Sequence, residues 1–152
     1  MKLLTILITL LTACTWNPNV NEIAAPEGES VAVEIIRMHY ARIHGELPPY
    51  TGKITWTDDE CIQVDWRDVH ACVGGAYYTG DARIYVVDRG YIWKSALVHE
   101  LAHYWLDEEG DSDGDHSRLD WWDMVPIIEG KLKAWEETEW PVGVWVGWRK
   151  DS

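Results

Sequence analysis

The sequence contains no phenylalanine, few basic residues and only three cysteines. Its 13 lysines and arginines stand against 26 aspartates and glutamates, so the chain carries a formal charge of −13. Such a charge repels phosphate backbones and anionic lipid headgroups, which argues against nucleic-acid binding and against electrostatic adsorption to a membrane. The sequence also lacks internal repeats, a glycine-rich phosphate loop and a hydrophobic run long enough to span a bilayer. The sequence therefore offers no sign of nucleic-acid, nucleotide or charge-driven membrane binding, and its function has to be sought in its other motifs.

Tryptophan replaces phenylalanine as the main large aromatic residue, with eleven copies in 152 residues. Large aromatic side chains mostly serve packing, and we expect that role for most of these. The segment from Trp140 to Trp148 alternates small and apolar residues, which predicts a strand. Stacking of its tryptophans on glycans, or a place beside a substrate groove, is the alternative use.

The most informative residues are the five from His99 to His103, which read His-Glu-Leu-Ala-His. On a helix, the two histidines stand one turn apart on one face, and Glu100 lies about 100° around the axis. Neutral imidazole nitrogens are good zinc ligands, and a catalytic zinc site keeps one position for water. Glu100 could accept the proton of that water. The surrounding segment, Tyr91 to Leu106, is apolar on every face, so we expect a buried helix.

This pattern resembles the signature of the zincin metallopeptidases, which carry His-Glu-x-x-His on a central helix. The resemblance implies one Zn²⁺ per chain and hydrolysis of peptide bonds, with Glu100 as the catalytic general base. Zincins take their third metal ligand from further along the chain. The metzincin form would need glycine at 106 and histidine at 109, whereas this chain has Leu106 and Glu109.

Two residues are candidates for the third ligand. His116, thirteen residues after His103, resembles the downstream histidine of small three-histidine zincins, and a loop could bring it back over the helix. Glu129 would resemble the gluzincin arrangement, in which a second helix supplies a glutamate. We favour His116, because imidazole suits zinc. A nearby aspartate is a third option, but Asp115 and Asp120 are better suited to accept a hydrogen bond from a ligand imidazole.

The loop from Asp107 to Asp115 holds six carboxylates in nine residues. Acidic residues oppose the dipole at a helix C-terminus, so we expect the motif helix to end near Leu106 and Gly110 to help turn the chain. The alternating aspartates of the loop resemble an EF-hand, but the sixth position is His116 instead of glycine and the twelfth is Trp122 instead of glutamate. A solvated loop is therefore favoured over a calcium site.

The start of the chain resembles a bacterial lipoprotein signal. Residues 1–13 consist of a short basic start and an apolar run too short to cross a bilayer as a mature helix. This run is followed by Cys14, and Leu-Thr-Ala-Cys resembles a lipobox, whose cysteine becomes lipid-modified and N-terminal after cleavage. An ordinary cleaved signal is the alternative. Residues 14–30, with two prolines and no sustained periodicity, predict a tether.

Lipidation of Cys14 would anchor the chain in the cell envelope through its acyl chains. The expected place is the outer membrane or another periplasm-facing membrane in a Gram-negative bacterium, and the extracellular face otherwise. Cys61 and Cys72 then remain as a possible disulfide, which an oxidising compartment permits. Two reduced thiols are the alternative. We expect a monomer that acts on a peptide, a protein or a cell-wall peptide.

Residues 31–152 are long enough for one hydrophobic core and too short for two. Ser30 is a candidate N-cap for a helix from Val31 to His44, which Gly45 would end. His44 suits the C-terminus of that helix because of the helix dipole. A further helical segment is expected from Leu119 to Trp135, interrupted or started near its proline.

Between the first helix and the motif helix the sequence has a β-like pattern. The expected strands are Gly52 to Thr57, Cys61 to Trp66, Ala71 to Tyr78, and Ala82 to Asp88. The last two should form a hairpin. In zincins the strand before the motif helix often pairs with extended substrate, and by resemblance Ala82 to Asp88 takes that place; an ordinary sheet strand is the alternative. The expected fold is a minimal zincin-like α+β domain, with a small antiparallel sheet on the central helix and helices at both ends.

The leading interpretation is a lipid-anchored zinc metallopeptidase. His99, His103 and His116 would hold the metal, and Glu100 would be the general base. One alternative is a non-catalytic lipoprotein that zinc stabilises and that presents tryptophans to cell-wall glycan or to a partner protein. The other is a metal-dependent amidase or endopeptidase that acts on peptidoglycan.

Overall fold

The computed structural model describes residues 18–66, 69–111 and 115–139. The elements in chain order are β1 (Glu22–Ile23), α1 (Glu29–His44), β2 (Ile54–Thr57), β3 (Ile62–Trp66), β4 (Val69–Val73), β5 (Gly75–Tyr78), β6 (Arg83–Val87), the 3-10 helix η1 (Ile92–Lys94), α2 (Leu97–Glu108), α3 (Leu119–Trp122) and α4 (Val125–Glu139). The fold class is α+β, as the sequence predicts. The predicted signal peptide, Cys14 and the C-terminal tryptophan strand lie outside the described residues.

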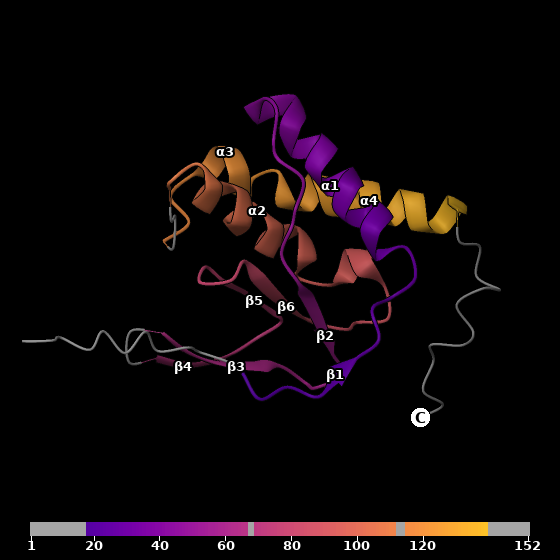
Figure 1. Ribbon diagram of the computed structural model, residues 1–152. Coiled ribbons are helices and arrows are strands. Elements are labelled where there is room, and N and C mark those ends of the chain that lie inside the picture. The colour runs from indigo at the N-terminus through magenta and orange to yellow at the C-terminus, as the bar shows by residue number, and fades with distance from the viewer. Residues whose placement is uncertain (1–17, 67–68, 112–114, 140–152) are drawn as a thin grey trace, which may run out of the picture.

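The helices lie together on one face of a four-stranded sheet, and the two-stranded β3–β4 ribbon lies on the other (Figure 1). Successive side chains of β6 point to opposite faces of the sheet. Ile84 and Val86 therefore join the core beneath the helices, whereas Tyr85 and Val87 pack with Ile62 of the ribbon. This alternation places β6 inside the molecule and lays α2 directly over β5 and β6.

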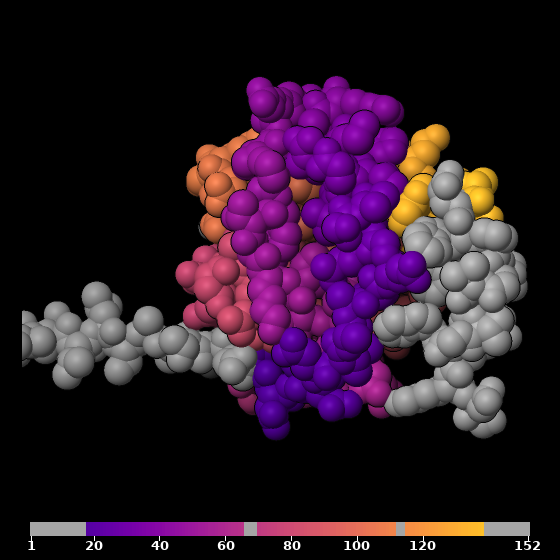
Figure 2. Space-filling model, turned by 45° about the vertical axis from the view of Figure 1, so that its right-hand side comes forward, coloured from indigo at the N-terminus to yellow at the C-terminus, as the bar shows by residue number. Residues whose placement is uncertain are grey.

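Helix α2 is the centre of the helical layer and contacts α1, α3, α4 and η1. It buries apolar side chains on several sides, among them Leu97, Leu101 and Trp105, each with no exposed surface. The expectation of a buried motif helix is therefore confirmed. In the space-filling view, α1 and the segment that leads from it to β2 cover one side of this layer (Figure 2). Among the described residues, no helix combines the length and apolar composition that a membrane span requires.

Two helices begin at other residues than the sequence suggests. Helix α1 begins at Glu29, because Gly28 adopts a left-handed conformation with φ of 85° and accepts the first helical hydrogen bond; Ser30 is therefore inside the helix. Helix α2 begins at Leu97, because the Ser95 hydroxyl accepts a hydrogen bond from the Leu97 amide and separates α2 from η1. It continues two residues past the predicted end, to Glu108.

The sheet is mixed instead of antiparallel. Strands β2 and β6 pair in parallel, with Ile54 opposite Ile84, since the β3–β4 ribbon and β5 lie between them in the chain. The predicted strand from Ala71 to Tyr78 is divided at Gly74 between the ribbon and the main sheet. Strand β6 has partners on both sides, so the predicted substrate strand, Ala82 to Asp88, is not an edge. The edge strand beside α2 is β5.

Two further predictions concern the N-terminal segment and the cysteines. Glu22 and Ile23, which the sequence places in a tether, pair with the end of β2 and belong to the folded domain. Cys61 and Cys72 form a disulfide with a Cα–Cα distance of 5.4 Å. The bridge joins the residue before β3 to β4, so it holds the ribbon closed at the end next to the main sheet.

Candidate metal centre

His99 and His103 stand on the same face of α2, as the one-turn spacing requires. Their Nε2 atoms are 3.2 Å apart and both side chains are partly buried. The rings meet at a steep angle of 73° with centroids 4.9 Å apart. Two ring nitrogens of one helix therefore face a common point above its surface.

His116 reaches the same point from the loop after α2. Its Nε2 atom lies 3.1 Å from Nε2 of His99, and the ligand atoms of His99, His103 and His116 all lie within 4.8 Å of one another. The backbone of His116 has φ of 59°, a conformation that residues other than glycine rarely adopt. The loop accepts this conformation where it turns the imidazole back toward α2.

The separations of the His99 nitrogen from the other two suit a tetrahedral metal ion. Zinc–nitrogen bonds of about 2.0–2.1 Å at tetrahedral angles place two ligand nitrogens about 3.3 Å apart, close to the separations of 3.1 and 3.2 Å found here. Burial and the neighbouring His116 lower the pKa of His99 to about 4. The His99 ring is therefore neutral near pH 7 and has a lone pair to offer. The three histidines are positioned to hold a metal ion.

Trp122 packs against all three histidine rings. Its ring centroid lies 4.9 Å from that of His99, 4.7 Å from His103 and 4.4 Å from His116. The indole, on α3, thus connects the two histidines of α2 with the histidine of the loop. Side chains packed in this way restrict the rotamers of the imidazoles and hold their ring planes.

Arg118 links the two ends of the loop that carries His116. Its guanidinium donates from Nη1 to Asp111, at 2.7 Å, and from Nε and Nη2 to the two oxygens of Asp120, at 3.1 and 3.0 Å. Asp120 therefore pairs with Arg118, and not with a metal-ligand histidine as predicted. The hydrogen bond predicted for Asp115 is not among the described interactions, and its side chain is exposed.

Glu100 lies between α2 and the edge strand β5 with 5% of its surface exposed. Burial raises the pKa of its carboxyl group to about 8, although the backbone amide of Tyr77 donates a hydrogen bond that opposes the rise. Strand and helix approach closely at Gly75, where a Cβ atom would lie 2.8 Å from Oε1 of Glu100. The hydroxyl of Tyr77 donates to Asp107 at 2.9 Å and fastens β5 to the end of α2.

Glu129, the alternative third ligand, is not part of the histidine cluster. It lies on α4 near Tyr40 of α1, whose pKa its charge helps to raise, behind the larger effect of burial. Burial also raises the pKa of Glu129 itself. The structure therefore brings together the three predicted histidines and leaves Glu129 at the α1–α4 contact.

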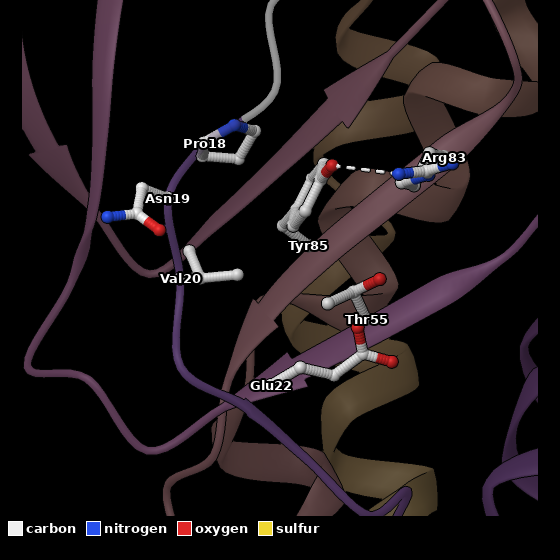
Figure 3. Close-up of a pocket in the computed structure, with 7 residues that line it drawn as sticks. All are labelled: Pro18, Asn19, Val20, Glu22, Thr55, Arg83 and Tyr85. Carbon is white, nitrogen blue, oxygen red and sulfur yellow. Dashed lines mark hydrogen bonds between the residues drawn. The ribbon is translucent and has the colours of Figure 1, made fainter.

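A separate polar pocket of about 280 Å³ opens on the face of the sheet opposite the helices (Figure 3). Pro18, Asn19 and Val20 of the N-terminal segment lie across from Arg83 and Tyr85 of β6. The charged groups of its wall are paired, Arg83 with Asp81 at 2.9 Å and Glu22 with Lys53 at 2.8 Å. This lining does not select a ligand of either charge, and no histidine of the cluster borders the pocket.

Sequence reasoning missed three residues of the site: Gly75, Arg118 and Trp122. Arg118 had a visible signal, since it is the only lysine or arginine between Asp107 and Met124. Trp122 had none, because its neighbour Trp121 has the same chemistry and only the path of α3 separates their roles.

Comparison with known proteins adds no relative to this description. No protein-family profile matches the chain, and no curated protein or solved structure shows significant similarity to it. The chemistry proposed for the site therefore rests on its own residues.

Proposed function

We propose that this protein is a zinc-dependent hydrolase of peptide bonds. The observation that carries the proposal is the convergence of His99, His103 and His116. Nε2 of His99 lies 3.2 Å from that of His103 and 3.1 Å from that of His116, separations that suit tetrahedral zinc, and the three ligand atoms all lie within 4.8 Å of one another. A glutamate follows directly after the first of these histidines in the chain. Zinc held by three protein ligands supplies a polarised water of lowered pKa and a Lewis acid for the substrate carbonyl.

Glu100 is the proposed general base. It would accept a proton from the water as this water attacks the peptide carbonyl, and it would then donate that proton to the departing amine. Its burial against β5 raises the pKa of the carboxyl group to about 8, and the positive charge of a bound zinc ion would lower that pKa, so that an ionised carboxylate is available to accept a proton near pH 7. The carboxylate is also held in place, since it accepts a hydrogen bond from the Tyr77 amide and the backbone of Gly75 packs closely against it.

Strand β5 is the proposed docking site for the substrate backbone. It takes the part that the zincin resemblance assigned to Ala82 to Asp88. β5 is the outermost strand on its side of the described sheet, it lies against α2, and it contains the Tyr77 amide that contacts Glu100. An extended peptide that adds to such an edge gains main-chain hydrogen bonds whatever its side chains are.

The test is a Glu100→Gln variant, which keeps the shape of the side chain and removes its basicity. The variant should bind zinc one to one but lose hydrolysis of unfolded protein and of purified cell-wall sacculi, assayed side by side. Glu129→Gln is the matched control and should leave both properties unchanged. Hydrolysis by Glu100→Gln at the wild-type rate would remove Glu100 as the base. A wild-type protein that binds zinc and hydrolyses neither substrate would support a purely structural metal.

We further propose that the protein works in the cell envelope, anchored through Cys14. The Cys61–Cys72 disulfide supports an oxidising compartment, and the sequence before Cys14 resembles a lipoprotein signal. Membrane fractions of cells that express the full chain should contain the protein, and Cys14→Ser should release it from them. An unchanged distribution of the Cys14→Ser protein would contradict lipid anchoring.

A further inference from the structure

His116 differs from the other two histidines in what holds it. His99 and His103 are fixed by the backbone of α2, whereas His116 is exposed, lies on a loop and has a left-handed backbone. An unrestrained loop of this kind would sample many conformations, and fixing the backbone of each of its residues would cost conformational entropy. Something other than helix geometry must keep the third imidazole over α2.

The guanidinium of Arg118 is placed to do this. It bridges Asp111, which follows the end of α2, and Asp120, which belongs to α3, so one side chain closes the loop on both sides of His116. An isolated surface ion pair contributes little. Here, however, both oxygens of Asp120 are engaged by two different nitrogens, and a second carboxylate shares the same cation. Forked and networked pairs of this kind are the ones that hold geometry.

Asp120 is itself next to the core. Its carboxylate lies 3.7 Å from Nδ1 of His44, a side chain that is 8% exposed and that stacks on Trp121. The loop is therefore tied, through Arg118 and Asp120, to an element that cannot move without disturbing buried residues. Arg118, Asp111 and Asp120 thus form a clamp on the loop, and Asp120 is its fixed end.

We propose that Arg118 is a positioning residue for metal binding. It holds the loop closed so that His116 stands at the metal site before the ion arrives. The inference rests on the proposed zinc site, and it adds a residue that touches neither metal nor substrate. Preorganised ligands bind more tightly because less conformational entropy remains to be lost on binding.

Charge alone predicts the opposite effect, which makes the proposal easy to test. Arg118 is a cation near a site for a divalent cation, so removing its charge would strengthen zinc binding if only Coulomb repulsion mattered. If Arg118 acts as a clamp, its removal weakens zinc binding. Variants of Asp111 do not separate the two explanations, because losing a nearby negative charge and losing the clamp both weaken binding.

The experiment measures zinc affinity by competition with a chromophoric chelator. Arg118→Gln should weaken affinity about tenfold, the lower end of the range for residues that support metal ligands. Arg37→Gln is the matched control, since Arg37 makes a similar forked pair with Glu34 on α1, and it should change affinity little. Arg118→Lys keeps the charge, loses the fork and should still weaken binding. Unchanged or stronger binding by Arg118→Gln would overturn the proposal.

Two further measurements separate the clamp from general damage and from failure of the zinc proposal. In a His116→Ala background, Arg118→Gln should have no additional effect on affinity, because the ligand that it positions is gone; a full additional loss would contradict the clamp. In the metal-free protein, nuclear Overhauser contacts between His116 and Trp122 should be present in wild type and weakened in Arg118→Gln. Persistence of these contacts in the variant would refute the clamp even if wild type bound no zinc.

Discussion

Two neighbouring tryptophans on α3 belong to two different aromatic clusters, each of which includes histidine. Trp121 is fully buried and stacks on His44, with centroids 4.0 Å apart, and on Tyr40, at 4.9 Å. Trp122 is partly buried and contacts the three histidines of the candidate metal centre. The first cluster holds one histidine beside Tyr40 and the second holds three histidines, so only the second has enough imidazoles to surround a metal ion.

The two clusters also differ in the direction of their polar atoms. In the Trp121 cluster, the buried Tyr40 hydroxyl, His44 Nε2 and Trp121 Nε1 have no hydrogen-bond partner among the described residues. In the Trp122 cluster, three Nε2 atoms face one point. Ring stacking by itself therefore indicates packing, whereas lone pairs that converge on one point indicate a candidate metal site. The following variants test this contrast in order of decreasing effect.

The largest effect is expected from removing one converging nitrogen. His99→Ala should weaken zinc binding by roughly a thousandfold or more, since two imidazoles cannot complete the proposed site. His44→Ala should change zinc affinity at most about threefold, because His44 is not one of the converging histidines and acts only indirectly, through Trp121 and through its contact with Asp120, but it should lower the melting temperature. Isothermal titration with zinc and thermal unfolding of the metal-free proteins would measure both. Equal zinc affinities for the two variants would erase the distinction between the clusters.

The two tryptophans should separate stability from metal binding. Trp121→Ala should lower the free energy of unfolding by about 3–5 kcal/mol, as expected for a fully buried large aromatic. Trp122→Ala should cost less stability, because its side chain is only partly buried, and should weaken zinc affinity about tenfold through looser histidine rotamers. Urea unfolding of the metal-free protein and chelator competition would be compared. If Trp122→Ala is the more destabilising variant, the roles assigned here are reversed.

Substitution of Gly75 tests how closely β5 packs against α2 at Glu100. A Cβ atom there would lie 2.5 Å from Cβ of Ala96 and 2.8 Å from Oε1 of Glu100. Gly75→Ala should therefore cost about 1–3 kcal/mol of stability as an overpacked position, and it should reduce hydrolysis by displacing Glu100. Gly74→Ala is the control, because nothing lies within 4 Å of its Cβ position. Denaturant unfolding should show a clear difference between these adjacent substitutions, and equal stabilities would contradict the close approach of β5 to α2.

The smallest effect is expected at Tyr40, and its sign is informative. Tyr40→Phe keeps the ring that stacks on Trp121 and removes a buried hydroxyl that has no described partner. Removing such a group should leave stability unchanged or raise it by up to about 1 kcal/mol. Calorimetric melting would measure the change. A loss of stability of more than about 1 kcal/mol would mean that the Tyr40 hydroxyl makes a stabilising contact.

Much of the helical framework was readable from the sequence. The apolar pattern predicted α1, the motif helix and the region of α3 and α4, and Gly45 ends α1 as expected, with φ of 91°. Boundaries were wrong where one residue decided them, as at Gly28 and Ser95. The parallel pairing of β2 with β6 was not readable, because strand alternation gives the face of each side chain and says nothing about which strand lies beside it.

The candidate site divides in the same way. The sequence by itself determined that His99 and His103 share a face and that Glu100 lies beside them, because helix periodicity fixes these relations within one turn of backbone. Only the tertiary structure decided that His116 joins them, that Glu129 does not, and that Trp122 instead of Trp121 packs against the three histidines. These relations depend on how a loop closes and which face of α3 meets the core, and both follow from burial and long-range contacts that a local pattern does not contain.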